Sequence, residues 1–294
     1  MIMAEKVKKI KQLKKKSRFA MTWRQLRKNK VAMASLVVLI ILILVAIFAP
    51  YLAPYGYEVA DKRHALEGPS PEHPLGTDRL GRDVLSRLIW GSRQSISIGI
   101  LAILISAILG IFIGSIAGYF GGWVDNLLMR LLDIYQSIPM MLLCITFAAV
   151  LGPSLKNAII AIGISMVPGF ARLMRAQILT VRDMEYIEAA RCCDASDLRI
   201  LVTHIIPNAI SPIIVNITMS IGGAVMSGAG LSFIGLGVQS PVAEWGAMIS
   251  DARNYLRANG YLALYPGLCI MITVLGFNLL GDGLRDALDP KLKN

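Results

Sequence analysis

Long apolar runs separated by short polar connections make up most of this sequence. The first run, residues 31–49, is apolar throughout and is long enough to cross a bilayer as a helix. Five further runs of this kind are expected at residues 95–119, 134–151, 155–170, 209–234 and 262–280. The pattern therefore predicts an all-α integral membrane protein with six transmembrane helices.

The polar connections divide the chain into segments. We expect a basic tail at residues 1–30, the first transmembrane helix at 31–49, an external loop with a short leading helix at 50–94, a five-helix transmembrane domain at 95–284 and a tail at 285–294. In the second span, Gly110, Gly114 and Gly118 recur every four residues and share one helix face. Small residues on such a face let another helix approach closely.

One segment inside the five-helix domain, residues 182–212, is rich in charge, and its charged side chains could not rest in hydrocarbon unpaired. Helical spacing predicts one apolar face, formed by Leu198, Leu201, Val202 and Ile205. Ser196 is placed to cap the second of two short helices, with Asp197 in its first turn. Pro207 and Pro212 are expected to break or kink the chain where the next span begins.

This amphipathic segment allows two interpretations. It could lie on the lipid surface, as basic amphipathic helices do, or it could present a docking surface to a partner. Its polar face carries charges of both signs, whereas helices that lie on lipid are usually rich in Lys and Arg. The sequence therefore favours a docking surface.

Composition and charge support the membrane assignment and orient the chain. Hydrophobic residues make up 55%, charged residues 17%, and the mean hydropathy is +0.60. The net charge of +11 comes mostly from Lys and Arg before residue 31, which places the N-terminus in the cytoplasm. No nucleic-acid-reading module accompanies this charge, so nucleic acid is not an expected partner. Six crossings then place the charged loop at about 182–208 and the C-terminus in the cytoplasm.

The sequence contains no motif that predicts catalysis, nucleotide binding or metal binding. It lacks a phosphate-binding loop of the G-x-x-x-x-G-K-[ST] type, and its four cysteines and three histidines do not have the spacing of a zinc site. The centres of the six expected spans contain no charged residue or histidine, whereas ion-coupled transporters keep such groups there. We therefore expect no metal, cofactor or catalytic centre, and a pore-forming subunit driven by partners. A stand-alone secondary transporter or channel, or an integral enzyme, are the alternatives from other classes.

Three stretches of the sequence resemble a known family. Glu188-Ala189-Ala190, followed by Ser196-Asp197-Leu198 and Ile205-Ile206-Pro207-Asn208, resembles the EAA loop of ABC importer permeases, and in particular the second permease subunit of the dipeptide/oligopeptide/nickel branch. The strings HPLGTDRLGRD at 73–83 and LSFIGLGVQSPVAEWGAM at 231–248 match the same branch. The family usually has Gly where this chain has Asp194, and Asp tolerates a left-handed turn less well than Gly.

The resemblance implies partners and a site. The partners are a second permease subunit in a heterodimer, two ABC ATPase subunits and an extracytoplasmic substrate-binding protein, assembled in the cytoplasmic (inner) membrane of a prokaryote. The residues implied in ATPase docking are Glu188, Ala189, Ala190, Arg191, Asp194, Ser196 and Asp197. Peptides are the expected substrate, with nickel and glutathione as alternatives. For residues 73–87 we favour a structural loop leading into a helix over a substrate site.

Overall fold

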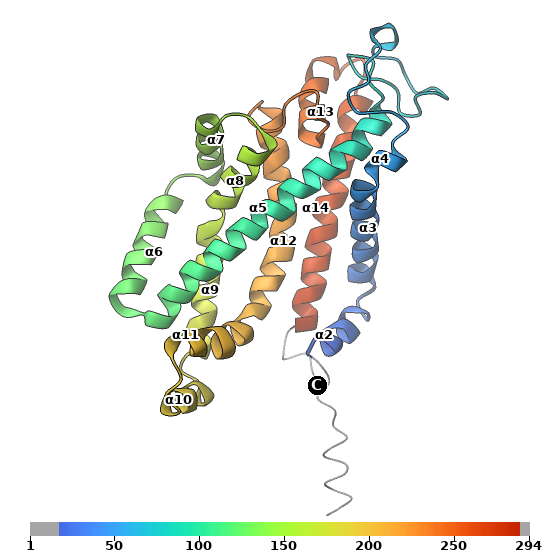
Figure 1. The fold of residues 1–294 in the computed structure, drawn as a ribbon. Helices are drawn as coiled ribbons and strands as arrows, with labels where there is room; N and C mark the ends of the chain where they lie inside the picture. The colour runs from blue at the N-terminus through green and yellow to red at the C-terminus, as the bar shows by residue number, and fades with distance from the viewer. Residues whose placement is uncertain (1–17, 289–294) are drawn as a thin grey trace, which may run out of the picture.

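The computed structural model describes residues 18–288, which form a bundle of long helices with short helices at both ends (Figure 1). The α-helices are α2 (Arg18–Leu26), α3 (Lys30–Ile47), α4 (Ala49–Leu52), α5 (Val84–Phe120), α6 (Gly122–Gln136), α7 (Met140–Leu151), α8 (Leu155–Ser165), α9 (Val167–Val181), α10 (Glu185–Cys192), α11 (Asp197–Ile200), α12 (Ile206–Phe233), α13 (Trp245–Ala252) and α14 (Tyr261–Leu288). Most of the predicted basic tail, residues 1–17, and the last residues, 289–294, lie outside the described part.

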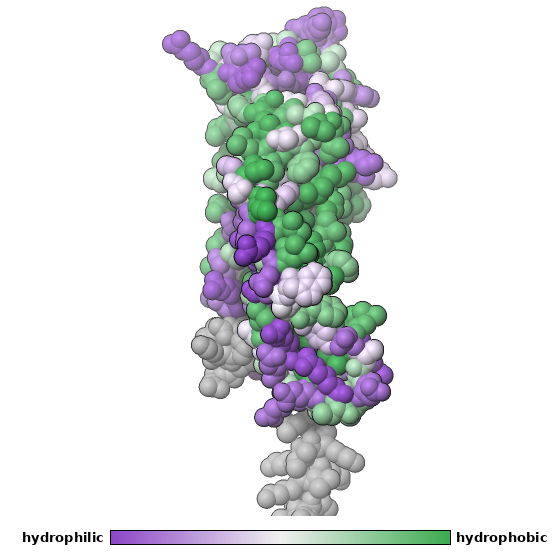
Figure 2. All heavy atoms as spheres, turned by 90° about the vertical axis from the view of Figure 1, so that its left-hand side faces the viewer, coloured by the Kyte–Doolittle hydropathy of each residue, from purple (hydrophilic) through white to green (hydrophobic). Residues whose placement is uncertain are grey.

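The predicted membrane fold is confirmed: within residues 18–288, five helical segments are long and apolar enough to cross a bilayer. They are α3, α5, the α8–α9 run Leu155–Val181, the run Asp197–Phe233 that ends with α12, and α14. Figure 2 shows one face of the bundle as an apolar surface between polar ends. Helices α2, α10 and α11 lie at one end, called here the coupling end, and the loop of residues 53–83 with α13 lies at the other, the loop end (Figure 1).

The prediction of one straight transmembrane helix at residues 134–151 is wrong. The chain instead forms α6 and α7, which are bent by 82° relative to each other and make a sixth crossing only if counted together. Pro139 precedes the first residue of α7, and a proline can neither donate the helical hydrogen bond nor fit the preceding turn. α6 begins twelve residues before the predicted start and has no buried residue.

The fourth expected span, residues 155–170, is too short, and the prediction that Arg172 and Arg175 begin the charged loop is wrong. Both arginines lie within α9. Arg172 pairs with Asp133 at 2.7 Å and Arg175 pairs with Asp125 at 2.5 Å, so both ion pairs join α9 to α6. The helices thus carry charged groups that the sequence analysis did not place in the bundle. Pairing lowers the cost of bringing them there.

Helix α5 joins the expected leading helix and second span into one helix of 37 residues. Asp83 caps its start by accepting a 2.7 Å hydrogen bond from the Ser86 amide. Its glycine face packs against α9: a Cβ at Gly110 or Gly114 would collide with the Phe170–Ala171 backbone, and one at Gly118 would lie 2.9 Å from Ile178 Cβ. Because only glycine fits, these three residues set how closely the two helices approach.

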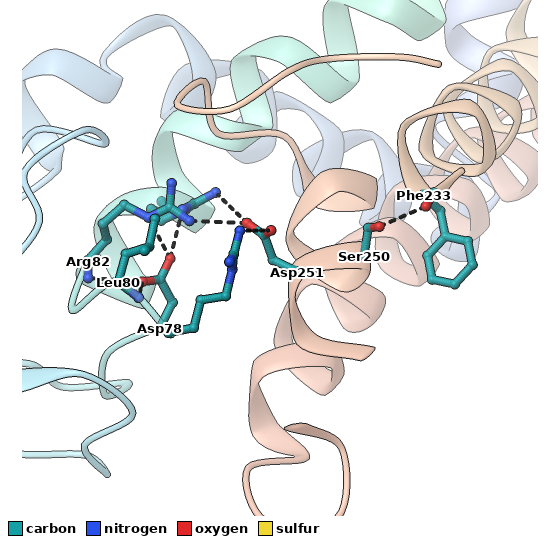
Figure 3. A network of polar contacts seen from close by, with 8 residues as sticks. Asp78, Leu80, Arg82, Phe233, Ser250 and Asp251 are labelled. Carbon is teal, nitrogen blue, oxygen red and sulfur yellow. Dashed lines mark hydrogen bonds and ion pairs between the residues drawn. The ribbon is translucent and has the colours of Figure 1, made fainter. Parts of the chain in front are cut away.

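A cluster of ion pairs connects the loop, the start of α5 and α13 at the loop end. The sequence analysis did not predict it. Asp78 Oδ2 accepts hydrogen bonds from Arg82 at 2.6 Å and from Arg87 at 2.7 Å, and Asp251 of α13 accepts one from Arg82 at 3.1 Å (Figure 3). The side chains of Arg82 and Arg87 are only 2% exposed. The 73–87 string is therefore a structural clamp between the loop, the start of α5 and α13.

Nearby, a second buried carboxylate attaches α13 to α5. Glu244 is fully buried, accepts a hydrogen bond from Ser95 at 2.9 Å and caps α13 through the amides of Gly246 and Ala247. The Trp245 indole donates to the Leu88 carbonyl at 3.1 Å. The EWG stretch, expected as part of an external connection, is thus a buried helix start that fixes the loop end to the bundle.

Candidate functional site

The candidate site is the pair α10 and α11 with the turn between them, residues 185–200, called here the coupling segment. It projects beyond the long helices at the coupling end (Figure 1). Glu185 and Glu188 lie in the first turn of α10 and Arg191 lies in its last turn. Acidic groups at the start of a helix and basic groups at its end are favoured by the helix dipole, so this charge order stabilises a short helix.

A few apolar side chains anchor the coupling segment to the bundle. Ile187 of α10 and Ile200 of α11 are fully buried in the main core cluster. Ala190 and Ala195 are half-buried against the same cluster. The small side chain of Ala190 is therefore partly covered by the core of this chain.

Most of the residues implied in ATPase docking remain exposed. These are Glu188, Ala189, Arg191, Asp194, Ser196 and Asp197. They form a surface of mixed charge around the small side chain of Ala189. Ile187 and Ile200 attach this surface to the core. Such a surface can bind a protein partner through charge pairs and close backbone approach.

The turn between α10 and α11 is built around Asp194. Its φ of 56° lies in the left-handed region, as the sequence analysis expected of the position where the family usually has Gly. The Asp194 amide bonds to the Arg191 carbonyl at 3.0 Å, and the Ala195 amide bonds to the Ala190 carbonyl at 3.3 Å. These bonds close the end of α10 and reverse the chain into α11.

The predicted cap at Ser196 is wrong in its chemistry. Ser196 does precede α11, but its hydroxyl makes no capping hydrogen bond, and only its carbonyl joins the helix by accepting from the Ile200 amide. Asp197 does lie in the first turn. Its carboxylate accepts a 2.5 Å hydrogen bond from the Tyr119 hydroxyl at the end of α5. The first turn of α11 is therefore fixed by a tertiary contact and not by a local cap.

The predicted apolar face of this region is only partly buried. Ile205 is fully buried, but Leu198 and Val202 are 72% and 52% exposed. Both line an apolar groove of about 640 Å³ along α5, together with Phe112 and Phe120. Ile200, which was not part of the predicted apolar face, is buried in the core, whereas Leu198 and Val202 are not.

The expected break at the start of the fifth span is a widened turn instead. Residues 201–205 form one π-helical turn, in which the Ile206 amide bonds to the Leu201 carbonyl. Pro207 then falls in the first turn of α12, where a missing amide hydrogen costs least, and Pro212 lies inside α12. The helical run from Asp197 to Phe233 is therefore continuous, and α11 leads directly into a helix long enough to cross the membrane.

The coupling segment is also tied to the end of α5 by contacts that the sequence analysis missed. The Arg182 guanidinium donates to the Gly118 carbonyl at 2.9 Å, and the Arg191 guanidinium lies 5.9 Å from the centre of the Tyr119 ring. With the Tyr119–Asp197 hydrogen bond, these contacts join the residues just before α10, the end of α10 and the start of α11 to one helix. A tyrosine at the end of an apolar span was the available signal, because such residues favour the membrane boundary.

Taken together, a bundle of membrane-crossing helices with an exposed helix pair attached to α5 and to the run that ends with α12 is the architecture of a membrane transport subunit. The chain belongs to the family of binding-protein-dependent transport system inner membrane components, whose model matches residues 110–294. Residues 17–69 match the N-terminal transmembrane domain of oligopeptide transport permease C. The chain is thus a transmembrane permease subunit of an ABC importer.

Curated relatives agree over nearly the whole chain. The dipeptide transport system permease protein DppC of Alkalihalophilus pseudofirmus is 46% identical over 272 residues, covering 92% of this chain and 90% of that protein. The glutathione transport system permease protein GsiD of Pectobacterium atrosepticum is 44% identical over 273 residues, covering 92% and 91%. GsiD of Escherichia coli is 47% identical over 272 residues, covering 92% and 90%.

Among solved structures, the fold is similar to an inward-facing conformation of the MetNI methionine ABC transporter. The TM-score is 0.56 at 19% identity, and the match covers 69% of this chain and 96% of that chain. A second crystal form of that transporter gives a TM-score of 0.57 at 19% identity, covering 70% and 97%. This likeness concerns the fold.

Proposed function

We propose that this chain forms half of the translocation pathway of a peptide importer in the cytoplasmic membrane of a prokaryote. A second permease subunit completes the pathway, an extracytoplasmic binding protein delivers the peptide at the loop end, and two ABC ATPase subunits act at the coupling end. In this assembly the chain is non-catalytic, and ATP is hydrolysed by the partner subunits.

The observation that carries this proposal is the construction of the coupling segment. Its outer surface, with Glu188 and Ala189, is exposed, while Ile187 and Ile200 fix it to the core. An ATPase bound to that surface would move α11, and through it the continuous helix to Phe233, without first deforming a flexible loop. Closing of the ATPases on ATP would thus reach the pathway, and hydrolysis would reset it.

Docking is tested by purifying the tagged chain in mild detergent from cells that express the whole transporter. Wild-type chain is expected to bring down the second permease and the ATPases. The double variant Glu188→Lys, Ala189→Glu reverses one charge and adds bulk on the outer surface, so it should lose the ATPases and keep the second permease. Glu58→Lys, a charge reversal at an exposed residue outside the coupling segment, is the control and should keep both. A wild-type chain that purifies alone would contradict the proposal.

The substrate is tested separately by uptake into cells that lack other peptide importers. We expect import of dipeptides, because DppC, which is 46% identical to this chain, is a dipeptide permease protein. Glutathione is the second candidate, supported by the similar identity of the GsiD proteins, and nickel is a third. Uptake of labelled dipeptide, glutathione and nickel in the same strain separates them, and uptake of nickel alone would refute a peptide importer.

A further inference from the structure

Two helix interruptions meet at one cavity near the middle of the bundle. A cavity of about 430 Å³ is lined by the bend between α6 and α7, by the junction of α8 and α9 at Met166, and by α12. Met166 lies near the middle of the Leu155–Val181 span, and Asn216 lies near the middle of the run from Asp197 to Phe233. Interrupted helices at membrane depth are tolerated where they line a cavity, and in transporters they mark where solute binds.

The polar groups of this cavity are available for binding. They come from Tyr135, Gln136, Ser165, Asn216 and Ser220. In the described structure Gln136, Asn216 and Ser220 have no side-chain hydrogen bond. The Tyr135 hydroxyl lies near Ser165 but is buried without a hydrogen bond of acceptable geometry. A buried hydroxyl without a good hydrogen bond is costly, so a polar group that enters the cavity could stabilise it by supplying one.

Packing is loose beside the cavity on both α9, which carries Gly169, and α12, which carries Gly223. Gly169 and Gly223 each have open space where a Cβ would be, unlike the packed glycines of α5. Asn216 also lines a second cavity of about 380 Å³, which reaches Arg285 near the end of α14. The two cavities therefore share one polar residue and extend from the middle of the bundle to the coupling end.

We propose that these two cavities are this subunit's wall of the solute pathway and that Asn216, Ser220 and Tyr135 form a subsite for the amide groups of a peptide. Carboxamide and hydroxyl groups both donate and accept hydrogen bonds, as peptide amides do. The polar side chains lining the first cavity are all neutral, so the subsite can accept peptides whatever the charge of their side chains. This inference rests on the proposed import of peptides.

The first test is accessibility, measured on the whole transporter in proteoliposomes. In a background with Cys144, Cys192, Cys193 and Cys269 replaced by alanine, Asn216→Cys and Ser220→Cys are compared with Ile214→Cys, which lies on another face of α12. We expect a membrane-impermeant methanethiosulfonate to modify the first two at least tenfold faster. Dialanine during turnover should slow that modification about fivefold or more, and nickel should not. Equal rates at all three positions would overturn the pathway assignment.

The second test separates binding from folding. Tyr135→Phe removes a hydroxyl that makes no hydrogen bond of acceptable geometry within residues 18–288, so the melting temperature should stay the same or rise while dialanine import falls several-fold. Asn216→Leu should lower import about tenfold and Asn216→Ser should restore part of it, with ATPase binding unchanged in both. Unchanged import in Tyr135→Phe and Asn216→Leu would refute the subsite. If the unmodified transporter imports no peptide, the proposed function fails instead, and accessibility still decides whether the cavity is aqueous.

Discussion

The Tyr119 hydroxyl, at the end of α5, donates a 2.5 Å hydrogen bond to Asp197 Oδ1 in the first turn of α11. These residues are 78 positions apart in the sequence. The bond connects the segment that we propose binds the ATPase with α5, the 37-residue helix that packs against α9. The coupling segment is therefore attached to two membrane-crossing helices, to α12 through the continuous run and to α5 through this bond.

Removing this bond should loosen the coupling segment without unfolding the bundle. Tyr119→Phe keeps the ring beneath Arg191 but loses a hydrogen bond to a charged group, which is worth about 1.5–3 kcal/mol. Hydrogen exchange at residues 197–200 should accelerate, and transport per ATP hydrolysed should fall. Tyr186→Phe, at an exposed tyrosine of α10, is the control and should change neither quantity. Unchanged exchange in Tyr119→Phe would show that the bond does not hold α11.

Asp194 is expected to matter for its backbone conformation more than for its carboxylate. With φ at 56°, glycine fits this turn at least as well, so Asp194→Gly should retain ATPase binding in the detergent pull-down. Asp194→Val places a β-branched residue in the left-handed region, at a cost of about 1–3 kcal/mol, and should weaken binding. Loss of binding in the glycine variant would instead assign a role to the carboxylate.

The α5–α9 contact should tolerate no added side chain. A Cβ at Gly114 would collide with the Ala171 carbonyl and lie 2.9 Å from Met174 Cβ, so Gly114→Ala should lower stability by about 1–3 kcal/mol. Gly267→Ala in α14 is the matched control, because nothing lies within 4 Å of its Cβ position. Thermal melting in detergent should show a clear decrease for Gly114→Ala alone. Equal melting temperatures would mean that the helices can separate at little cost.

The ionic cluster at the loop end should be the most sensitive electrostatic feature. Asp78→Ala leaves Arg82 and Arg87 buried with one partner fewer, and breaking such a buried group costs about 3–5 kcal/mol. The expected result is a large loss of folded protein in fluorescence-detected size-exclusion chromatography. Asp61→Ala removes an ion pair to Arg63, whose side chain is 84% exposed, and should leave the profile unchanged. Similar profiles for the two variants would refute a structural role for the cluster.

The sequence by itself determined the helical membrane architecture, because a continuous apolar run of sufficient length has few other stable states in a bilayer. Residues 31–49 therefore predicted α3 to within two residues, and residues 262–280 predicted the start of α14, which continues to Leu288. The same argument located the coupling segment, since its charges cannot enter hydrocarbon unpaired, whereas the left-handed turn at Asp194 was expected from the resemblance to a family that usually has Gly there. The spacing of Gly110, Gly114 and Gly118 was enough to predict a close helix contact, although not that α9 makes it.

Tertiary structure decided which distant residues meet, and this is where the sequence analysis failed. Arg172 and Arg175 marked a span boundary by composition, but both lie within α9 and pair with Asp133 and Asp125 on α6. Arg82 and Asp251, 169 positions apart, pair only because α13 folds against the start of α5. The direction of the α6–α7 bend, and hence the central cavity, also depends on neighbouring helices. Local patterns fix hydrophobic length and turn chemistry, whereas the pairing of buried charges depends on which helices become neighbours.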